Sequence, residues 1–338
     1  MSEKAIRSRA YPDYFSSKLE NYLSLSKPRL LATVVLSALL GFVLPMGLSN
    51  TFFQLLLLLF GTALMGAGAN TLNQCMEIGP DSRMNRTKNR ALPMGKLSEK
   101  EAMIFGILIS VSGFLVLWFG LNFLTAVLGL LTLLSYIMVY TPLKQKTATN
   151  TWLGGVTGAL PPVMGWVAAR GQLEWEVLPI FALLYFWQLP HFFAIAWMYR
   201  DDYKRGGFKM LSHYDQTGNR TATQMLINCG LLYAASLAVF LVNQGSMVYL
   251  AGASALGLVF FAVIALFYKE STVENARKVF LASIIYLPLM LVGIYIVQCF
   301  AQCGSHFFWG FNVIAGYIDG TDHDFFATNE LDQLDRHM

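Results

Sequence analysis

Hydrophobic residues gather in nine long runs that short polar segments separate. The runs are residues 30–48, 51–72, 102–119, 122–140, 152–169, 178–198, 222–242, 247–268 and 279–297. Each run approaches or reaches the ~20 residues that a helix needs to cross the hydrocarbon of a bilayer. Because backbone groups inside a membrane must bond within their own segment, such runs predict helices. We therefore predict an all-α, polytopic membrane protein with nine transmembrane helices.

The fifth run differs from the others in its glycines and its Pro161-Pro162 pair. Such a composition predicts a helix that is broken or closely packed, which a membrane protein tolerates where protein or a cavity surrounds it. We divide the chain into an N-terminal segment of residues 1–28, a nine-helix domain of residues 29–298 and an acidic, aromatic-containing tail of residues 299–338.

Composition supports a membrane protein. The 338-residue chain is 55% hydrophobic and 13% charged, whereas soluble domains carry roughly 25% charged residues. Of the 24 Lys and Arg residues, 22 fall in the N-terminal segment or in the loops after the second, fourth, sixth and eighth runs. The positive-inside rule then places the N-terminus in the cytoplasm and the C-terminus in the periplasm. We expect a bacterial inner membrane rather than a mitochondrial one, and no nucleic-acid partner.

A polar segment at residues 73–90 directly follows the second run. Asn73, Glu77 and Asp81 are spaced i, i+4 and i+8, so they line one face of a helix. Gly79-Pro80 is expected to interrupt that helix just before Asp81. Basic residues follow at once: Arg83, Arg86, Lys88 and Arg90.

This segment therefore joins acceptors for a hard divalent cation to donors for phosphate. Mg²⁺ prefers carboxylate oxygens together with substrate phosphate, so the pattern predicts chemistry on a lipid diphosphate at the membrane surface. The alternative is a solvated helix end without function.

The loop after the sixth run repeats the pattern, with Asp201 and Asp202 before Lys204 and Arg205. Adjacent acids do not share a helix face, and Asp202 is the preferred metal ligand of the two. Two further basic patches lie at Lys144 and at Lys27-Pro28-Arg29. The simpler explanation of the first is the general excess of basic residues in cytoplasmic loops. That of the second is anchoring of the first span at the membrane surface.

His191 is the histidine that lies within a predicted span. An ionisable residue inside the membrane is a functional candidate by default, and a structural histidine bonded to a neighbouring helix is the alternative. Cys299 and Cys303 read as small apolar residues near a helix end, because a C-x3-C pair without further ligands is a weak signal.

Together these segments resemble the membrane prenyltransferases of the UbiA superfamily, and within it the branch that farnesylates haem. The first acidic segment carries the resemblance to the superfamily. Three segments, in this order, favour the haem branch: Tyr140-Thr-Pro-Leu-Lys144, Pro161-Pro162-x2-Gly165-Trp166 and Pro190-His191-Phe192. Two more segments also match: Leu25-Ser-Lys27-Pro-Arg29 and Arg200-x-Asp202-Tyr203. The resemblance covers roughly residues 20 to 300.

Four departures accompany the resemblance. The second acidic loop has Asp201-Asp202 and lacks the widely spaced acid pair of aromatic prenyltransferases. Glu77 stands where many members have Asp, and both are hard oxygen ligands. Ala91 stands where the family usually has Pro, which loosens the loop without removing a ligand. The tail from Cys303 onward matches nothing in the pattern.

The resemblance implies a UbiA-type helical bundle and a Mg²⁺-dependent reaction. Farnesyl diphosphate would be the donor, and the 2-vinyl group of haem B the acceptor. Water addition would complete haem O, which serves cytochrome oxidase biogenesis. A downstream haem A synthase or an oxidase assembly protein is an open question as a partner.

We assign residues on that basis. The metal ligands are Asn73, Glu77, Asp81 and Asp202, and the diphosphate ligands are Arg86, Arg90, Lys144 and Lys204. Within these sets Asp81, Arg86, Lys144 and Asp202 are the catalytic residues. Tyr140 and Tyr199 would stabilise an allylic cation through their ring faces, or only pack. His191 would bind a haem propionate, ligate the iron or orient the porphyrin.

Two other functions remain open from the sequence. One is prenyl transfer to an aromatic acceptor such as 4-hydroxybenzoate or a quinone precursor. The other, from a different class, is a secondary transporter, in which repeated halves and charges at the membrane midplane are expected. Here the acids and bases cluster in loops instead.

Overall fold

Helices form where the apolar runs lie. The computed structural model describes residues 18–46, 52–242 and 247–290, and within those ranges every regular element is a helix. The long helices are α2 (Pro28–Met46), α3 (Phe52–Met76), α5 (Glu99–Gly120), α6 (Phe123–Leu134), α8 (Asn150–Arg170), α9 (Leu178–Met198), α12 (Asn219–Val242) and α13 (Met247–Lys269). Residues 273–290 form a further helix, called here the terminal helix.

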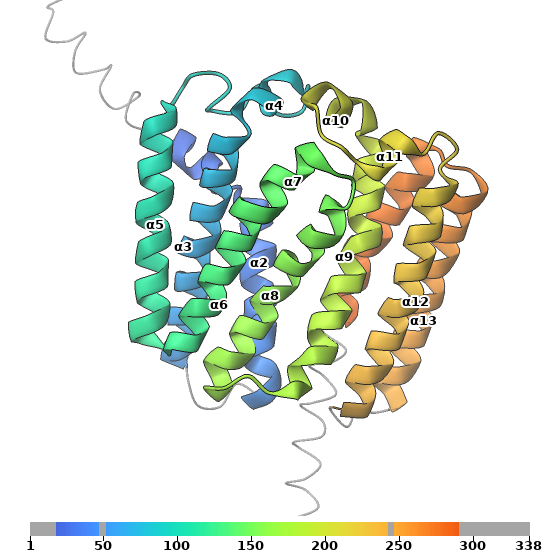
Figure 1. Ribbon diagram of the computed structural model, residues 1–338. Helices are drawn as coiled ribbons and strands as arrows, with labels where there is room; N and C mark the ends of the chain where they lie inside the picture. Colours follow the sequence, from blue (N-terminus) through green and yellow to red (C-terminus); the bar gives the residue numbers. More distant parts are fainter. Residues whose placement is uncertain (1–17, 47–51, 243–246, 291–338) are drawn as a thin grey trace, which may run out of the picture.

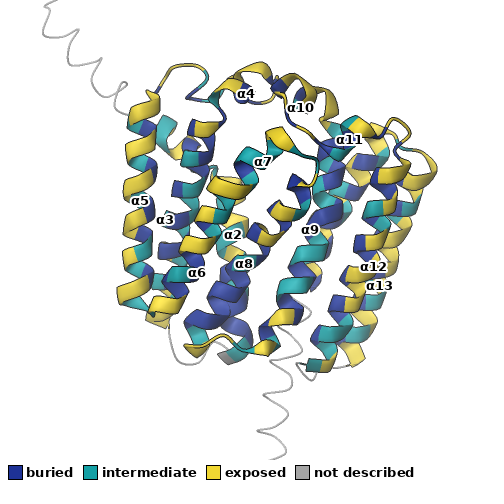
Figure 2. Cartoon of the chain, viewed as in Figure 1, coloured by how far each residue is buried: buried dark blue, intermediate teal, exposed yellow. Residues whose placement is uncertain are grey.

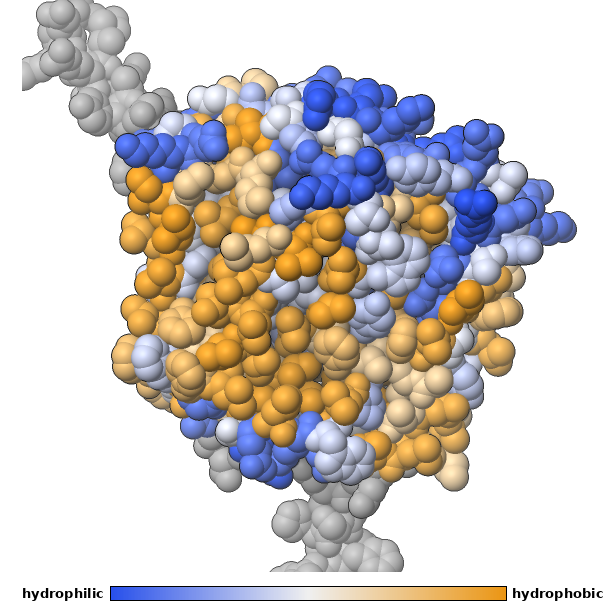
Figure 3. Space-filling model, in the orientation of Figure 1, coloured by the Kyte–Doolittle hydropathy of each residue, from blue (hydrophilic) through white to orange (hydrophobic). Residues whose placement is uncertain are grey.

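The long helices stand side by side as an upright bundle (Figure 1). Their exposed faces are apolar over the middle of the molecule, which Figure 3 shows as a broad hydrophobic belt between two hydrophilic ends. Figure 2 shows that the buried residues lie on the faces that the helices turn toward one another. The sides of the bundle therefore match a lipid environment.

The all-α prediction is confirmed, while the count of nine spans is not reproduced. Seven helical segments of the described chain are long and apolar enough to cross a membrane. The fifth predicted run forms α8, a 21-residue helix that is not among those seven. The ninth run extends past residue 290 and so lies partly outside the described residues, as do the tail, Cys299 and Cys303.

Helix α8 is continuous through Pro161 and Pro162, so the expectation of close packing holds and that of a break does not. It packs against α2 at very short range. A Cβ added to Gly165 would lie 2.0 Å from the carbonyl oxygen of Ala38, and one added to Gly41 would lie 1.9 Å from that of Pro162. Glycine at both positions lets the two backbones touch.

Short helices close one end of the bundle. These are α4 (Ile78–Arg83), α7 (Thr141–Lys146), α10 (Arg200–Gly206) and α11 (Leu211–Tyr214), and they share the upper end of the molecule in Figure 1. That end is strongly hydrophilic in Figure 3. The loop from α4 ends where Ser98 and Glu101 form a capping box that starts α5. The polar loops predicted to share one membrane face therefore do lie together.

Candidate active site

A polar cavity of about 80 Å³ lies at the hydrophilic end, between α3, α4, α7 and the loop after α10. It combines two acids with four basic residues. Its lining residues are Lys27, Asn73, Glu77, Asp81, Met84, Arg86, Arg90, Tyr140, Lys144, Tyr203, Phe208 and Met210.

Asn73, Glu77 and Asp81 face this cavity together, as their spacing predicts. The helix breaks at Glu77, between α3 and α4, and not at Gly79-Pro80 as the sequence suggested. The helical bonding pattern survives the break, because the Glu77 amide donates to the Asn73 carbonyl and the Asp81 amide to the Glu77 carbonyl. Pro80 is tolerated because it sits in the first turn of α4, where amide hydrogens lack helical partners anyway.

A π-helical turn, η1 (Ser135–Tyr140), carries Tyr140 and Lys144 into the same cavity. Pro142 has no amide hydrogen to bond residue 138, so an α-helical register cannot be completed there. The Thr141 hydroxyl instead donates to the Tyr136 carbonyl at 2.8 Å. Single π turns of this kind often occur at functional sites.

Both cavity acids are held in ion pairs. Lys144 Nζ lies 2.9 Å from Glu77 Oε1, and Arg90 Nη1 lies 2.7 Å from Asp81 Oδ2. The second oxygen of Asp81, Oδ1, is buried without a hydrogen-bond partner. A buried carboxylate oxygen left unpaired is unfavourable on its own, so this atom indicates a place for a ligand.

Lys27 completes the basic lining; the sequence showed it as part of a basic patch, and it is not among the assigned site residues. Its Nζ donates to Asn73 Oδ1 at 3.0 Å, while Asn73 Nδ2 donates to the Thr141 hydroxyl at 3.0 Å. Burial and the nearby Arg90 and Lys144 lower the pKa of Lys27 to about 7. Lys27 also has a positive φ of 50°, which is uncommon for a residue with a Cβ. The cavity is therefore electropositive enough to favour an anion.

Arg86 lies at the cavity edge and is tied to two tyrosines. Its Nη2 donates to the Tyr203 hydroxyl at 2.8 Å. Its guanidinium sits 4.7 Å from the ring centre of Tyr203 and 5.3 Å from that of Tyr199. Tyr203 lines the cavity, whereas the predicted Tyr199 is 42% exposed and does not. The Tyr203 signal was available in the sequence, one residue after Asp202.

Asp202 is buried, but it turns to the loop after α4 and not into the cavity. Its oxygens accept from the backbone amides of Asn85 at 3.0 Å and Arg86 at 3.2 Å, and Arg205 also donates to it. Burial opposes its ionisation, yet these donors hold the pKa of Asp202 below its usual value. Asp202 therefore holds the first polar loop in place through hydrogen bonds from that loop's backbone.

The remaining predicted polar residues of this end lie outside the cavity. Lys204 and Asp201 are exposed on α10. The cavity thus brings together seven of the predicted site residues and adds Lys27 and Tyr203. The seven are Asn73, Glu77, Asp81, Arg86, Arg90, Tyr140 and Lys144.

His191 lies outside this cavity, on the side of α9 that contacts the terminal helix. Its Nδ1 is 2.7 Å from the Ser283 hydroxyl. Its ring stacks with those of Trp187 and Phe280, whose centres are 5.6 Å and 4.9 Å away. It is half-buried.

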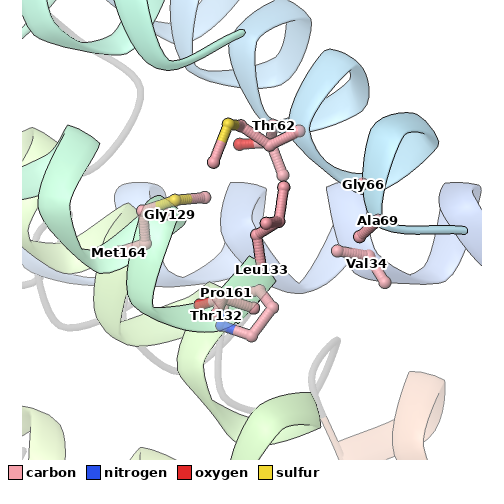
Figure 4. Close-up of a pocket in the computed structure, with 10 residues that line it drawn as sticks. Val34, Thr62, Gly66, Ala69, Gly129, Thr132, Leu133, Pro161 and Met164 are labelled. Carbon is pink, nitrogen blue, oxygen red and sulfur yellow. The ribbon is translucent and has the colours of Figure 1, made fainter. Parts of the chain in front are cut away.

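An apolar pocket of about 40 Å³ lies deeper in the bundle (Figure 4). Ala69 on its wall is one helical turn, or about 6 Å, further into the membrane than Asn73 on the same helix. Leu133 and Met164 close other sides. Helix α3 therefore lines both the polar cavity and an apolar pocket that lies deeper in the bundle.

The donor set of the polar cavity fits Mg²⁺ shared with a bound phosphate. No group of three or more His, Cys, Asp or Glu side chains able to hold a metal occurs in the described part of the chain. Mg²⁺ often takes only one or two carboxylates and completes its shell with water and substrate phosphate. Asp81, with its unpaired oxygen, and Glu77 supply that number of carboxylates.

Sequence comparison finds close relatives. The model of the UbiA prenyltransferase family matches residues 34–317. Protoheme IX farnesyltransferase of Solibacter usitatus is 40% identical over 80% of this chain and 96% of its own length. The enzyme of that name from Salinibacter ruber is 41% identical over 83% and 99%. The mitochondrial human protein is 38% identical over 79% of this chain, which spans 60% of its length.

Solved structures share the fold. A structure described as digeranylgeranylglyceryl phosphate synthase in membranes has a TM-score of 0.71 and 19% identity, covering 83% of this chain and 98% of that one. A UbiA homologue from Archaeoglobus fulgidus bound to DMAPP and Mg²⁺ has a TM-score of 0.61 and 14% identity, covering 81% and 99%. The relatives named above are protoheme IX farnesyltransferases, and the chain belongs to the UbiA prenyltransferase family.

Proposed function

We propose that this protein transfers the farnesyl group of farnesyl diphosphate to the 2-vinyl group of haem B, giving haem O. The observation that carries the proposal is the polar cavity, which places Glu77 and Asp81 among four basic residues above an apolar pocket. The names of its curated relatives supply the two substrates.

The diphosphate binds in the polar cavity. Lys27, Arg90 and Lys144 surround it, and Arg86 approaches from its edge. Two of these cations now neutralise Glu77 and Asp81, and a bound diphosphate offers them a stronger anionic partner. Arginine suits this role because its planar fork matches phosphate oxygens.

Glu77 and Asp81 are the proposed Mg²⁺ ligands, with Asn73 beside them. Mg²⁺ would neutralise charge that develops on the leaving diphosphate oxygens. The A. fulgidus homologue was solved with DMAPP and Mg²⁺, which supports the same metal here. Asp202 is proposed to act indirectly, because its oxygens are taken by the Asn85 and Arg86 amides.

Cationic residues placed around the diphosphate stabilise the transition state for breaking the allylic C–O bond. The ring of Tyr140 lies 4.5 Å from Lys144 Nζ and borders the cavity beside Tyr203. Such ring faces can stabilise an allylic cation. The apolar pocket below offers space for part of the farnesyl chain and excludes water from it.

The acceptor completes the reaction. The electron pair of the haem vinyl group attacks C1 of the farnesyl cation and forms a C–C bond. Water then adds to the adjacent carbon and loses a proton, which leaves the hydroxyethylfarnesyl group. Diphosphate is the leaving group, so atoms and charge balance.

A product assay tests this function. Membranes containing the protein, from a host that lacks haem O, receive haem B, farnesyl diphosphate and Mg²⁺, with and without EDTA. We expect an EDTA-sensitive haem whose mass carries the added hydroxyethylfarnesyl group. No new haem from folded protein would overturn the proposal.

The matched pair Asp81→Asn and Glu270→Gln tests the site. Each change replaces an acid by its amide, but Glu270 is exposed beyond α13. Loss of a metal-binding carboxylate should lower the rate by at least about 100-fold, whereas Glu270→Gln should leave it unchanged. Activity of Asp81→Asn near the normal rate, in correctly inserted protein, would exclude Asp81 as a ligand.

A further inference from the structure

The imidazole of His191 is hydrogen-bonded to a serine of the terminal helix. The Ser283 oxygen lies 2.7 Å from His191 Nδ1 and 2.6 Å from the Phe280 carbonyl oxygen. When the hydroxyl donates its single hydrogen to the Phe280 carbonyl, Nδ1 carries a hydrogen and donates it to Ser283. In that tautomer Nε2 is the unprotonated nitrogen, with a lone pair.

This lone pair has no protein partner. No hydrogen bond reaches Nε2 from the described residues, where the only recorded polar contact of the His191 side chain is the one to Ser283. Within the described residues, the fully buried side-chain polar atoms without a hydrogen-bond partner are Thr62 Oγ1, Asp81 Oδ1 and Thr221 Oγ1. Nε2 of His191 is not one of them. It therefore keeps an open edge on a half-buried side chain, within a segment apolar enough to span a membrane.

The ring is also held in place. It is stacked at 24° to Trp187 and at 29° to Phe280, and Trp187 Nε1 donates to the Ser283 carbonyl at 2.8 Å. These two ring contacts and the hydrogen bond to Ser283 restrict the orientation of the imidazole. A metal-binding histidine has these features: the second nitrogen donates to an oxygen, which fixes both tautomer and orientation.

We propose that His191 Nε2 is the axial ligand of the iron of the acceptor haem. This inference rests on the proposed function, which supplies haem B as the substrate. His191 precedes Tyr199 by eight residues, or about 12 Å along α9, and the Arg86 guanidinium lies over Tyr199. The iron would thus be held deeper in the bundle than the hydrophilic end that carries the polar cavity. Trp187, Phe192 and Phe280 supply apolar surface beside the macrocycle.

Haem binding without turnover tests the ligand. The full-length protein in lipid nanodiscs is titrated with haem B in the absence of farnesyl diphosphate, and optical and resonance Raman spectra report the axial ligand. We expect a histidine-ligated spectrum for the unmodified protein. His191→Ala should lose that signature, and added imidazole should restore it. A histidine signature that persists in His191→Ala would overturn the proposal.

Metal-free protoporphyrin IX separates ligation from shape. His191→Ala should weaken haem B binding at least tenfold while leaving the affinity for metal-free protoporphyrin IX unchanged. Ser283→Ala should weaken haem binding by about tenfold, because the orienting hydrogen bond is lost. Equal weakening for both porphyrins in His191→Ala would show a packing role and overturn the proposal.

The product assay on the unmodified protein keeps the two proposals apart. Formation of haem O together with an unchanged haem spectrum in His191→Ala would sustain the function and reject the ligand. A His191-dependent haem spectrum without transfer would sustain the ligand and reject the function.

Discussion

Asp202 shows how a residue can belong to a site without lining its cavity. Its carboxylate accepts hydrogen bonds from two backbone amides of a loop more than 100 residues away in sequence. That loop carries Arg86 and leads to Arg90, which pairs with Asp81. The neighbouring Asp201 is exposed because adjacent helical residues point in different directions. Of these two adjacent acids, Asp202 therefore holds the loop in place and Asp201 is a surface residue.

We predict that Asp202→Asn raises the KM for farnesyl diphosphate by about tenfold while leaving the Mg²⁺ concentration for half-maximal rate unchanged. Loss of charge-assisted bonds, worth about 1.5–3 kcal/mol, should loosen the Arg86 loop. Hydrogen exchange at the Asn85 and Arg86 amides should accelerate in the variant. A shifted Mg²⁺ requirement would instead assign Asp202 to the metal; Glu270→Gln serves as the control.

The hydrogen bonds that Asp202 accepts from this loop should depend on the ionisation of its carboxylate. The pKa of Asp202 is lowered in the folded protein, so its contribution to stability is present above the unfolded pKa of about 3.9 and is lost as pH falls through the folded value. Between pH 5 and 8 the protection of these two amides should therefore not depend on Asp202 titration. A loss of protection within that window that requires Asp202 would contradict the assignment.

At the scale of elements, helix contacts decide which faces meet. Alpha-helices α2 and α8 approach so closely that Gly41 and Gly165 face opposing backbone. The π turn before α7 changes the helical register, and thereby places Tyr140 and Lys144 in the cavity. Local sequence offers Pro142 and the glycines as signals, but the partner of each surface is set by packing.

We predict that Gly165→Ala destabilises the bundle, because its Cβ would lie 2.0 Å from the Ala38 carbonyl oxygen. Overpacking of this kind costs about 1–3 kcal/mol, occasionally more. Thermal unfolding in detergent measures the effect. Gly230→Ala on α12 is the matched control, since nothing lies within 4 Å of its added Cβ, and helix propensity alone should make it neutral or stabilising. Equal stability of both variants would contradict the close contact.

At the scale of the whole molecule, the apolar belt and the two hydrophilic ends indicate a protein that sits in a bilayer (Figure 3). The end with α4, α7, α10 and α11 holds the polar cavity and the basic loops. Farnesyl diphosphate suits this arrangement, because its charged head belongs at the polar end and its chain in the apolar interior.

We predict that this end faces the cytoplasm of a bacterial inner membrane, because the basic loops lie there. Lys96 lies in the connection between α4 and α5, and Leu173 in the connection between α8 and α9. Both positions are exposed, so Lys96→Cys and Leu173→Cys place accessible thiols at opposite ends of the bundle. A membrane-impermeant maleimide added to intact spheroplasts should label Leu173→Cys, and should label Lys96→Cys only after lysis. The reverse pattern would invert the topology.

The membrane class, the helical architecture and the shared face of Asn73, Glu77 and Asp81 could all be predicted from the amino-acid sequence. These follow from the length of apolar runs and from the helical period, which act within one segment. The sequence also pointed to the family through short motifs, and family membership is confirmed by the comparisons.

Contacts between distant groups come from the packing of the helices. Lys27 reaches Asn73 across 46 residues, Asp202 accepts from the Arg86 amide, and Ser283 bonds Nδ1 of His191. Such contacts depend on how separate helices pack and on which donor finds which acceptor. A residue's type and neighbours in sequence do not specify that choice, because it is made between segments that only folding brings together.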